Sequence, residues 1–240
     1  MEYNENGHII RISEETLIQM CLSGLEAYTI IHEESSKKKN KLETYGQLWG
    51  NEVILPDNKS LYCVEMLSID TSAIRDKDSV DYKDDALELK RDIMTSFWPQ
   101  YDFLGDFHTH PCNHYKEVVD NKWYEFSKAD YKSIEDYSEY WKKYNYRVGI
   151  VLSIAYMKKK SDKQSDWVNN STIEFTLGNY RFWIKGYVTY YDEEGKLKLT
   201  DHKDEGVVLE CPSITGLVGE YCKFGRAVGK KTLKHKCGTV

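Results

Sequence analysis

The fold is decided by the stretch Tyr101-Asp102-Phe103-Leu104-Gly105-Asp106-Phe107-His108-Thr109-His110-Pro111. Its first seven residues have the apolar character of a buried β-strand. Side chains two residues apart on a strand point to the same face, so the rings of His108 and His110 can converge on one metal ion. Pro111 is expected to end the strand, because proline has no N–H for the sheet. Two polar residues at the exit of a strand are the simpler interpretation of this pattern alone.

Apolar patterning on both sides of this stretch predicts a domain of mixed helices and strands. Helices are expected at residues 14–33, with Ser13 as the N-cap, at 86–98 and at 127–144. Strands are expected at residues 8–12, 42–50, 61–69, 146–156, 171–177, 180–191 and 196–199. Three polar segments are interpreted as surface loops or turns, at 71–85, 112–126 and 158–166.

Composition describes a soluble globular protein. The 240 residues are 40% hydrophobic and 30% charged, and no apolar run is long enough to cross a membrane. A formal net charge of -6 gives no reason to expect a nucleic acid or a membrane surface as partner. The polar N-terminus is unlike a secretory signal, so a cytoplasmic location is expected. The six cysteines form no Cys-x-x-Cys pair, which indicates reduced thiols rather than a zinc ribbon or a redox motif.

The last forty residues differ from the rest. They are rich in glycine, and after Glu220 every charged residue is basic. We therefore predict a main domain at residues 1–200 and a basic extension at 201–240. The segment at 225–232 fails the phosphate-loop pattern, because its glycines are too close together. Two interpretations of this extension remain open: a solvated chain end, or a segment that binds nucleic acid.

A catalytic metal needs a third ligand and a base. Asp130 is the candidate ligand, because its predicted helix begins one loop after the histidines. Ser127-x-x-Asp130 is equally a capping box that opens a helix. Glu43 is the candidate base, although alone it is an acid on a strand. Cys112 and His114 in the intervening loop could also ligate a metal, or could be a plain thiol and a solvated histidine.

The order of these pieces resembles the JAMM metalloprotease family, also called MPN or JAB. That family's signature is a glutamate followed by Gly-x-Leu-x-Gly, then His-x-His-Pro at the end of a strand, then Ser-x-x-Asp at the start of a helix. The chain matches it with Glu43 followed by Gly46-Gln47-Leu48-Trp49-Gly50, with His108-Thr109-His110-Pro111, and with Ser127 to Asp130. The resemblance covers roughly residues 9–190, and the loop at 112–126 is longer than the family usually has.

The resemblance implies a fold and a function. The fold would be α+β, with a curved, mostly antiparallel central sheet flanked by helices, as in MPN and cytidine-deaminase-like proteins. His108, His110 and Asp130 would hold one Zn²⁺, with Glu43 as general base and Ser127 as partner of the oxyanion. The substrate would be a peptide or isopeptide bond after the C-terminal tail of a ubiquitin-like protein. The segments at 71–85 and 112–124 would grip that tail, or are solvated linkers.

Two other functions remain open on the same residues. One is a small-substrate amidohydrolase or a peptidase that trims a sulfur-carrier protein. The other is a non-catalytic scaffold of the same fold, since the family includes members that lost their ligands. The presence of all the key residues, Glu43, His108, His110, Ser127 and Asp130, favours an enzyme.

Overall fold

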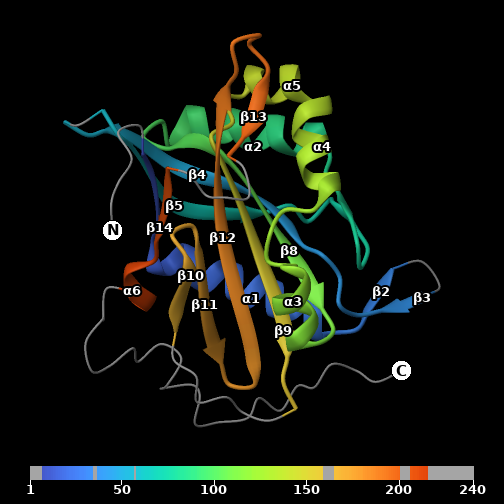
Figure 1. Ribbon diagram of the computed structural model, residues 1–240. Coiled ribbons are helices and arrows are strands. Elements are labelled where there is room, and N and C mark those ends of the chain that lie inside the picture. The colour runs from blue at the N-terminus through green and yellow to red at the C-terminus, as the bar shows by residue number, and fades with distance from the viewer. Residues whose placement is uncertain (1–6, 35–36, 57, 159–164, 201–205, 216–240) are drawn as a thin grey trace.

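A single curled sheet dominates the fold (Figure 1). The computed structural model describes residues 7–34, 37–56, 58–158, 165–200 and 206–215. The strand order is β10-β11-β12-β9-β8-β4-β5-β1-β14, and β13 pairs with β12. These strands are β1 (His8–Ile12), β4 (Tyr45–Ile54), β5 (Ser60–Ile69), β8 (Asp102–Cys112), β9 (Val148–Tyr156), β10 (Asp166–Asn169), β11 (Thr172–Leu177), β12 (Tyr180–Tyr191), β13 (Leu197–Leu199) and β14 (Val207–Glu210).

Two short hairpins and six helices complete the part of the chain that the structure describes. The hairpins are β2 (His32–Glu34) with β3 (Lys37–Lys39), and β6 (Ile74–Arg75) with β7 (Val80–Asp81). The helices are α1 (Glu14–Thr29), α2 (Asp84–Phe97), α3 (Tyr115–Asn121), α4 (Lys128–Asp136), α5 (Ser138–Lys143) and α6 (Pro212–Thr215). Ser13 caps α1 as predicted, because its side chain accepts a hydrogen bond from the Thr16 N–H.

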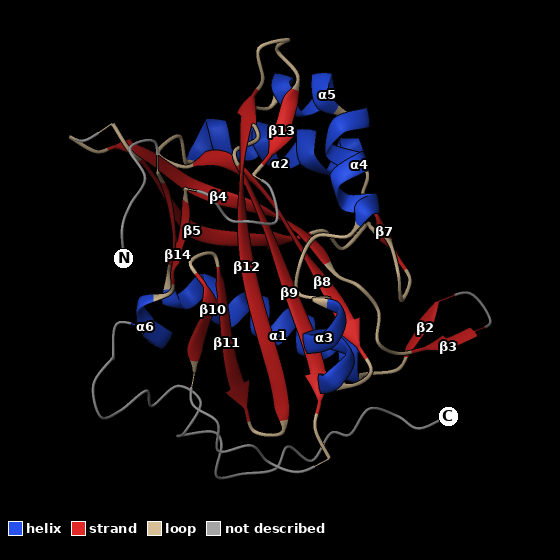
Figure 2. Ribbon diagram, viewed as in Figure 1, coloured by secondary structure: helices blue, strands red, loops and turns tan. Residues whose placement is uncertain are grey.

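The sheet is mixed but mostly antiparallel, and the predicted α+β class is confirmed. Only β8–β9, β1–β5 and β1–β14 pair in parallel among the described strands of the main sheet. In Figure 2, β4 and β5 run across the direction of β9 and β12, so the sheet is curled. Gly105 permits the close approach of β8 and β9, because its φ is +150° and a Cβ there would collide with the Val148 carbonyl oxygen.

Helices cover the sheet on two faces and make two cores. Helix α1 packs on one face, where Leu17 and Tyr28 join Phe107 of β8 in the larger apolar cluster. Helices α2, α4 and α5 pack on the other face around Trp141 and Tyr187. The strand with the histidines therefore has one face in a dry core and one face towards α4.

Several local predictions were wrong. The loop expected at 71–85 contains β6 and β7, the loop expected at 112–126 contains α3, and the helix expected at 127–144 is divided into α4 and α5 at Tyr137. The strand β10, which begins at Asp166, was not predicted. Pro111 does not end its strand, since β8 continues to Cys112. The Thr109 N–H donates to the Thr44 carbonyl oxygen, just before β4 begins. An N–H at position 111 would point the same way but lie beyond the start of β4. Proline at this position therefore costs the sheet no hydrogen bond.

The main sheet extends past the domain boundary predicted at residue 200. Val207, Val208 and Leu209 are buried in β14, which adds a parallel strand beside β1. Burying these apolar side chains against the sheet is more favourable than leaving them in a solvated extension. The segment at 225–232 and the basic residues after Glu220 lie outside the described residues. None of the described helices is long and apolar enough to span a bilayer.

Candidate metal centre

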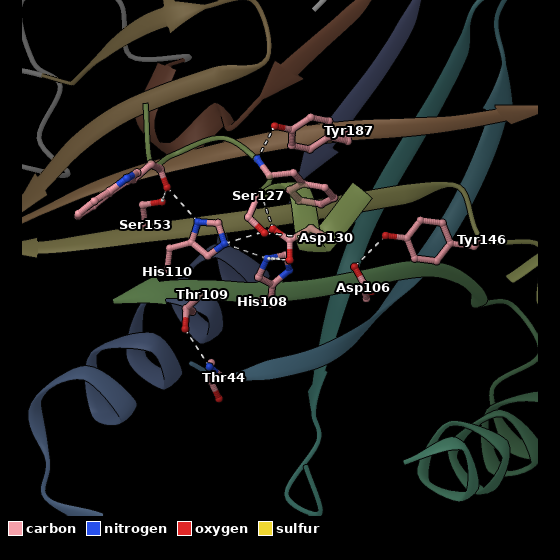
Figure 3. Close-up of polar contacts among 12 residues, drawn as sticks. Thr44, Asp106, His108, Thr109, His110, Ser127, Asp130, Tyr146, Ser153 and Tyr187 are labelled. Atoms are coloured by element: carbon pink, nitrogen blue, oxygen red, sulfur yellow. Dashed lines mark hydrogen bonds and ion pairs between the residues drawn. The ribbon is translucent and has the colours of Figure 1, made fainter. Parts of the chain in front are cut away.

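The two histidines lie side by side on the central strand β8. His108 is opposite Tyr45 of β4 and Val151 of β9, and His110 is opposite Ser153 of β9. Their side chains point to the same face, as the alternation along a strand requires. The Nε2 atoms of the two rings are 3.2 Å apart. Figure 3 shows both rings directed towards the start of α4.

Asp130 reaches both histidines from the first turn of α4. Its Oδ1 is 3.5 Å from His108 Nε2, and its Oδ2 is 3.5 Å from His110 Nε2. The same carboxylate completes the capping box, because the Ser127 N–H donates to Oδ2 at 2.6 Å and the Asp130 N–H donates to Ser127 Oγ at 3.2 Å. The cap and the candidate ligand are therefore one residue, and the cap orients the carboxylate towards the histidines.

These three residues form a donor set for a metal ion. Their potential ligand atoms all lie within 4.8 Å of one another. Among the described residues, His108, His110 and Asp130 are the group of His, Cys, Asp or Glu side chains that meets this condition. Cys112 and His114 are not in it: Cys112 is buried with its thiol directed at the His110 carbonyl oxygen, and His114 is exposed before α3. The side chains of His108, His110 and Asp130 are 9%, 15% and 24% exposed, so the group is partly accessible to solvent.

A second layer of contacts orients His110. Its Nδ1–H donates to the Trp123 carbonyl oxygen at 2.9 Å, which leaves the Nε2 lone pair facing Asp130. Ser153 Oγ donates to the same carbonyl oxygen at 2.9 Å. Sequence reasoning missed both residues. Ser153 carried a signal, because it is a hydroxyl residue in the otherwise apolar run of β9, whereas a backbone carbonyl such as that of Trp123 leaves none.

Aromatic side chains form the wall behind His108. The Phe126 ring lies 5.3 Å from the His108 ring and 3.9 Å from the Tyr187 ring, measured between centroids. The Tyr187 hydroxyl accepts a hydrogen bond from the Phe126 N–H at 2.7 Å. This contact ties the loop before α4 to β12, so the position of Asp130 is set by the core as well as by its own cap.

Glu43 lies just before β4, beside the donor set but not in it. The adjacent Thr44 is held to Thr109 by two hydrogen bonds, its N–H donating to Thr109 Oγ1 at 2.9 Å and its carbonyl accepting from the Thr109 N–H at 3.1 Å. Since Thr109 lies between the histidines, these bonds place the backbone of Glu43 next to them. The side chain is buried and lines the same cleft as His108 and Asp130.

The charged groups of the site shift one another's pKa values. Burial alone would lower the pKa of His108, but Asp130 and then Glu43 reverse this and raise it to about 9. Burial would raise the pKa of Asp130, yet the facing His108 and His110 hold it well below its usual range. Burial raises the pKa of Glu43 to about 7, even though His108 and His110 oppose that shift. A buried carboxyl that titrates near neutrality can accept and return a proton.

A cleft of about 620 Å³ opens over this site. Glu43, Ser127 and Asp130 lie in its lining with the two histidines. Residues 77–82, from the β6–β7 hairpin to just before α2, line it as well, as do residues 121–123 at the end of α3. Both segments that were expected to grip a substrate, 71–85 and 112–124, therefore contribute to the cleft, and each contains secondary structure that the sequence did not reveal.

Comparison with known proteins provides no second line of argument. No family model matches the chain, and no curated protein matches it. The solution structure of protein DSY2949 from Desulfitobacterium hafniense is 12% identical, with a TM-score of 0.38 over 88% of this chain and 99% of that one. The STIL N-terminal domain of Trichoplax adhaerens is 13% identical, with a TM-score of 0.34 over 75% of this chain and 43% of that one. Likenesses this distant say nothing about function.

Proposed function

We propose that the chain is a zinc-dependent hydrolase of the JAMM type, which cleaves a peptide or isopeptide bond after the C-terminal tail of a ubiquitin-like protein. The observation that carries the proposal is the spacing of the three donors. The two Nε2 atoms are 3.2 Å apart, and Asp130 places Oδ1 at 3.5 Å from one of them and Oδ2 at 3.5 Å from the other. A tetrahedral zinc ion with bonds of about 2.0–2.1 Å has ligands roughly 3.3 Å apart. An octahedral ion with bonds of that length would bring them to about 2.9 Å.

The chain provides three protein ligands for the metal, which is the number typical of a catalytic rather than a structural zinc site. His108 and His110 supply Nε2, and Asp130 supplies a carboxylate oxygen. A bound zinc ion supplies Lewis acidity and lowers the pKa of the water that completes its shell. The Trp123 carbonyl oxygen keeps the His110 ring in the tautomer that ligation requires.

Glu43 is the general base in this proposal. It is buried, lies outside the donor set and faces the same cleft, so it can take a proton from the attacking water without ligating the metal. The same carboxyl then returns the proton to the leaving amine. In the metal-free protein, burial raises the pKa of Glu43 to about 7.

Ser127 is the partner of the oxyanion. Its Oγ already accepts from the Asp130 N–H, which fixes the hydroxyl at the cleft wall next to the ligand. The hydroxyl keeps its own hydrogen to donate as negative charge develops on the substrate oxygen. No covalent acyl-enzyme is needed, because the nucleophile is water.

The ordered motifs and the segments that line the cleft support this substrate class. An extended C-terminal tail can lie along the cleft between residues 77–82 and 121–123, where backbone hydrogen bonds and side-chain pockets would both hold it. A small amide would occupy only the part of the cleft over the metal. Blocking or truncating a protein substrate's tail therefore separates the isopeptidase from the small-substrate amidohydrolase.

The test uses purified protein, a panel of ubiquitin-like fusions and added Zn²⁺. Wild type is expected to bind close to one zinc ion per chain and to cleave at least one fusion, with loss of cleavage on adding a chelator. Glu43→Gln is expected to keep zinc and the melting temperature but to lose cleavage by roughly 10²–10⁴-fold. Glu65→Gln, an exposed acid on β5, is the matched control and should cleave normally. Absence of zinc binding, or full activity of Glu43→Gln, would contradict the proposal.

A further inference from the structure

A recess beside the metal centre contains a carboxylate that the proposed chemistry does not use. Asp106 stands two residues before His108 on β8, so it lies on the same face and lines the same cleft. Only 8% of the residue is exposed. Its Oδ1 accepts a hydrogen bond from the Tyr146 hydroxyl at 2.8 Å, and Figure 3 shows this pair on the opposite side of His108 from His110. The Tyr45 side chain hydrogen-bonds the same carboxylate. A carboxylate has about four acceptor positions, so these two bonds leave about two open.

No basic side chain of the described residues forms an ion pair with Asp106. Two lysines line the cleft, Lys77 and Lys122. Lys77 lies between β6 and β7 and Lys122 follows α3, so neither lies on the sheet that carries Asp106. Burying a carboxylate without a cation is costly. With a divalent metal ion bound, Asp130 and Glu43 offset its formal charge, and Asp106 adds a third negative charge. Without the metal, His108 two residues away attracts this carboxylate.

Aromatic rings enclose the same recess. Tyr45 and Tyr82 stack with centroids 5.1 Å apart. The Trp141 ring lies 5.5 Å from that of Tyr82 and 4.8 Å from that of Tyr146. All four rings line the cleft with Asp106. Aromatic faces attract organic cations, and a carboxylate beside them accepts the N–H hydrogens of such a cation.

We propose that this recess binds an alkylammonium group of the substrate, such as a lysine side chain close to the bond that is cleaved. Asp106 accepts hydrogen bonds from the ammonium, while the rings of Tyr82 and Trp141 contact the methylene groups and share the charge. The assignment of this group to the substrate rests on the hydrolase function proposed above. Binding of an alkylammonium ion by the recess does not, because no residue of the donor set contributes to it.

The experiment titrates metal-free protein with n-butylammonium, and with 1-butanol as a neutral probe of the same length, by NMR chemical-shift changes. Wild type is expected to bind n-butylammonium at least tenfold more tightly than 1-butanol. Asp106→Asn is expected to remove that preference while keeping the acceptor for Tyr146. Asp78→Asn, an exposed acid in the lining of the same cleft, is the matched control and should keep the preference. Equal binding of both probes by wild type overturns the proposal, as does an undiminished preference in Asp106→Asn.

A second pair of variants keeps the proposal falsifiable if Asp106→Asn fails to fold, which a melting curve will show. Tyr82→Phe retains the ring and should retain n-butylammonium binding, whereas Tyr82→Leu should weaken it several-fold. Equal affinities of these two variants overturn the proposal. Because no metal is present in these titrations, a failed cleavage assay leaves their outcome unchanged, and failed ammonium binding leaves the zinc and Glu43 tests unchanged.

Discussion

The two faces of β8 differ in what their side chains do. On the face towards α1, Phe107 is fully buried in the larger core, and Thr109 holds the start of β4. On the face towards α4, Asp106, His108 and His110 line a cleft. Successive residues of one strand therefore alternate between packing in the core and lining the candidate site. The buried face anchors the strand in the core, and this fixes the positions of the candidate ligands on the other face.

The largest effect is expected from removing a ligand on the polar face. His108→Ala should abolish cleavage and weaken zinc binding on the order of 10³-fold, since one of three ligands accounts for a sizeable share of the binding free energy. Competition with a chromogenic chelator measures the affinity. Retention of tight zinc binding by this variant would show that His108 is not a ligand.

The neighbouring position on the dry face should behave in the opposite way. Phe107→Ala removes a fully buried ring and is expected to lower the free energy of unfolding by about 3–5 kcal/mol. The fraction that remains folded should still bind zinc with nearly the affinity of wild type. Urea unfolding and chelator competition on the same samples measure both quantities. A large loss of zinc affinity with unchanged stability would contradict the division between the two faces.

A smaller effect is expected from removing a hydrogen bond that supports His110. Ser153→Ala removes one of the two hydrogen bonds to the Trp123 carbonyl oxygen, while His110 keeps its own. Removing such a supporting contact should weaken zinc binding by roughly 10-fold, with little change in melting temperature. Ser133→Ala is the control, because this half-exposed serine of α4 lines the same cleft but is not one of the two donors to the Trp123 carbonyl oxygen, which are His110 and Ser153. Equal zinc affinities of wild type and Ser153→Ala would mean that this contact does not orient the ligand.

The smallest effect is expected from changing the pH. In the metal-free protein the pKa of His108 is raised to about 9, so below that pH His108 carries a proton that zinc must displace. The apparent zinc affinity is therefore expected to rise with pH, about tenfold per unit for one displaced proton, and to level off near pH 9. Chelator competition at pH 6.5, 7.5 and 8.5 would measure the slope. An affinity that is flat or falls over this range would contradict the assigned role of His108.

Much of this arrangement could be predicted from local sequence. Apolar runs predicted the strands β8, β9 and β12, and helical spacing after Ser13 predicted α1. Helix α3 was missed because its seven residues are too few to show a period among charged neighbours. The break at Tyr137 was missed because the apolar spacing continues across it, although the chain turns there to pack Trp141 into the second core.

The amino-acid sequence by itself determined which side chains a metal site would need and which face of β8 the histidines share, because alternation along a strand is a local property of the backbone. Only the tertiary structure decided that Asp130 returns to both histidines across a loop that contains a helix, and that Asp106 lies in an aromatic recess beside them. It also decided that β14, from beyond the expected boundary, completes the sheet. These contacts join segments far apart in the chain, and their geometry depends on how the whole core packs.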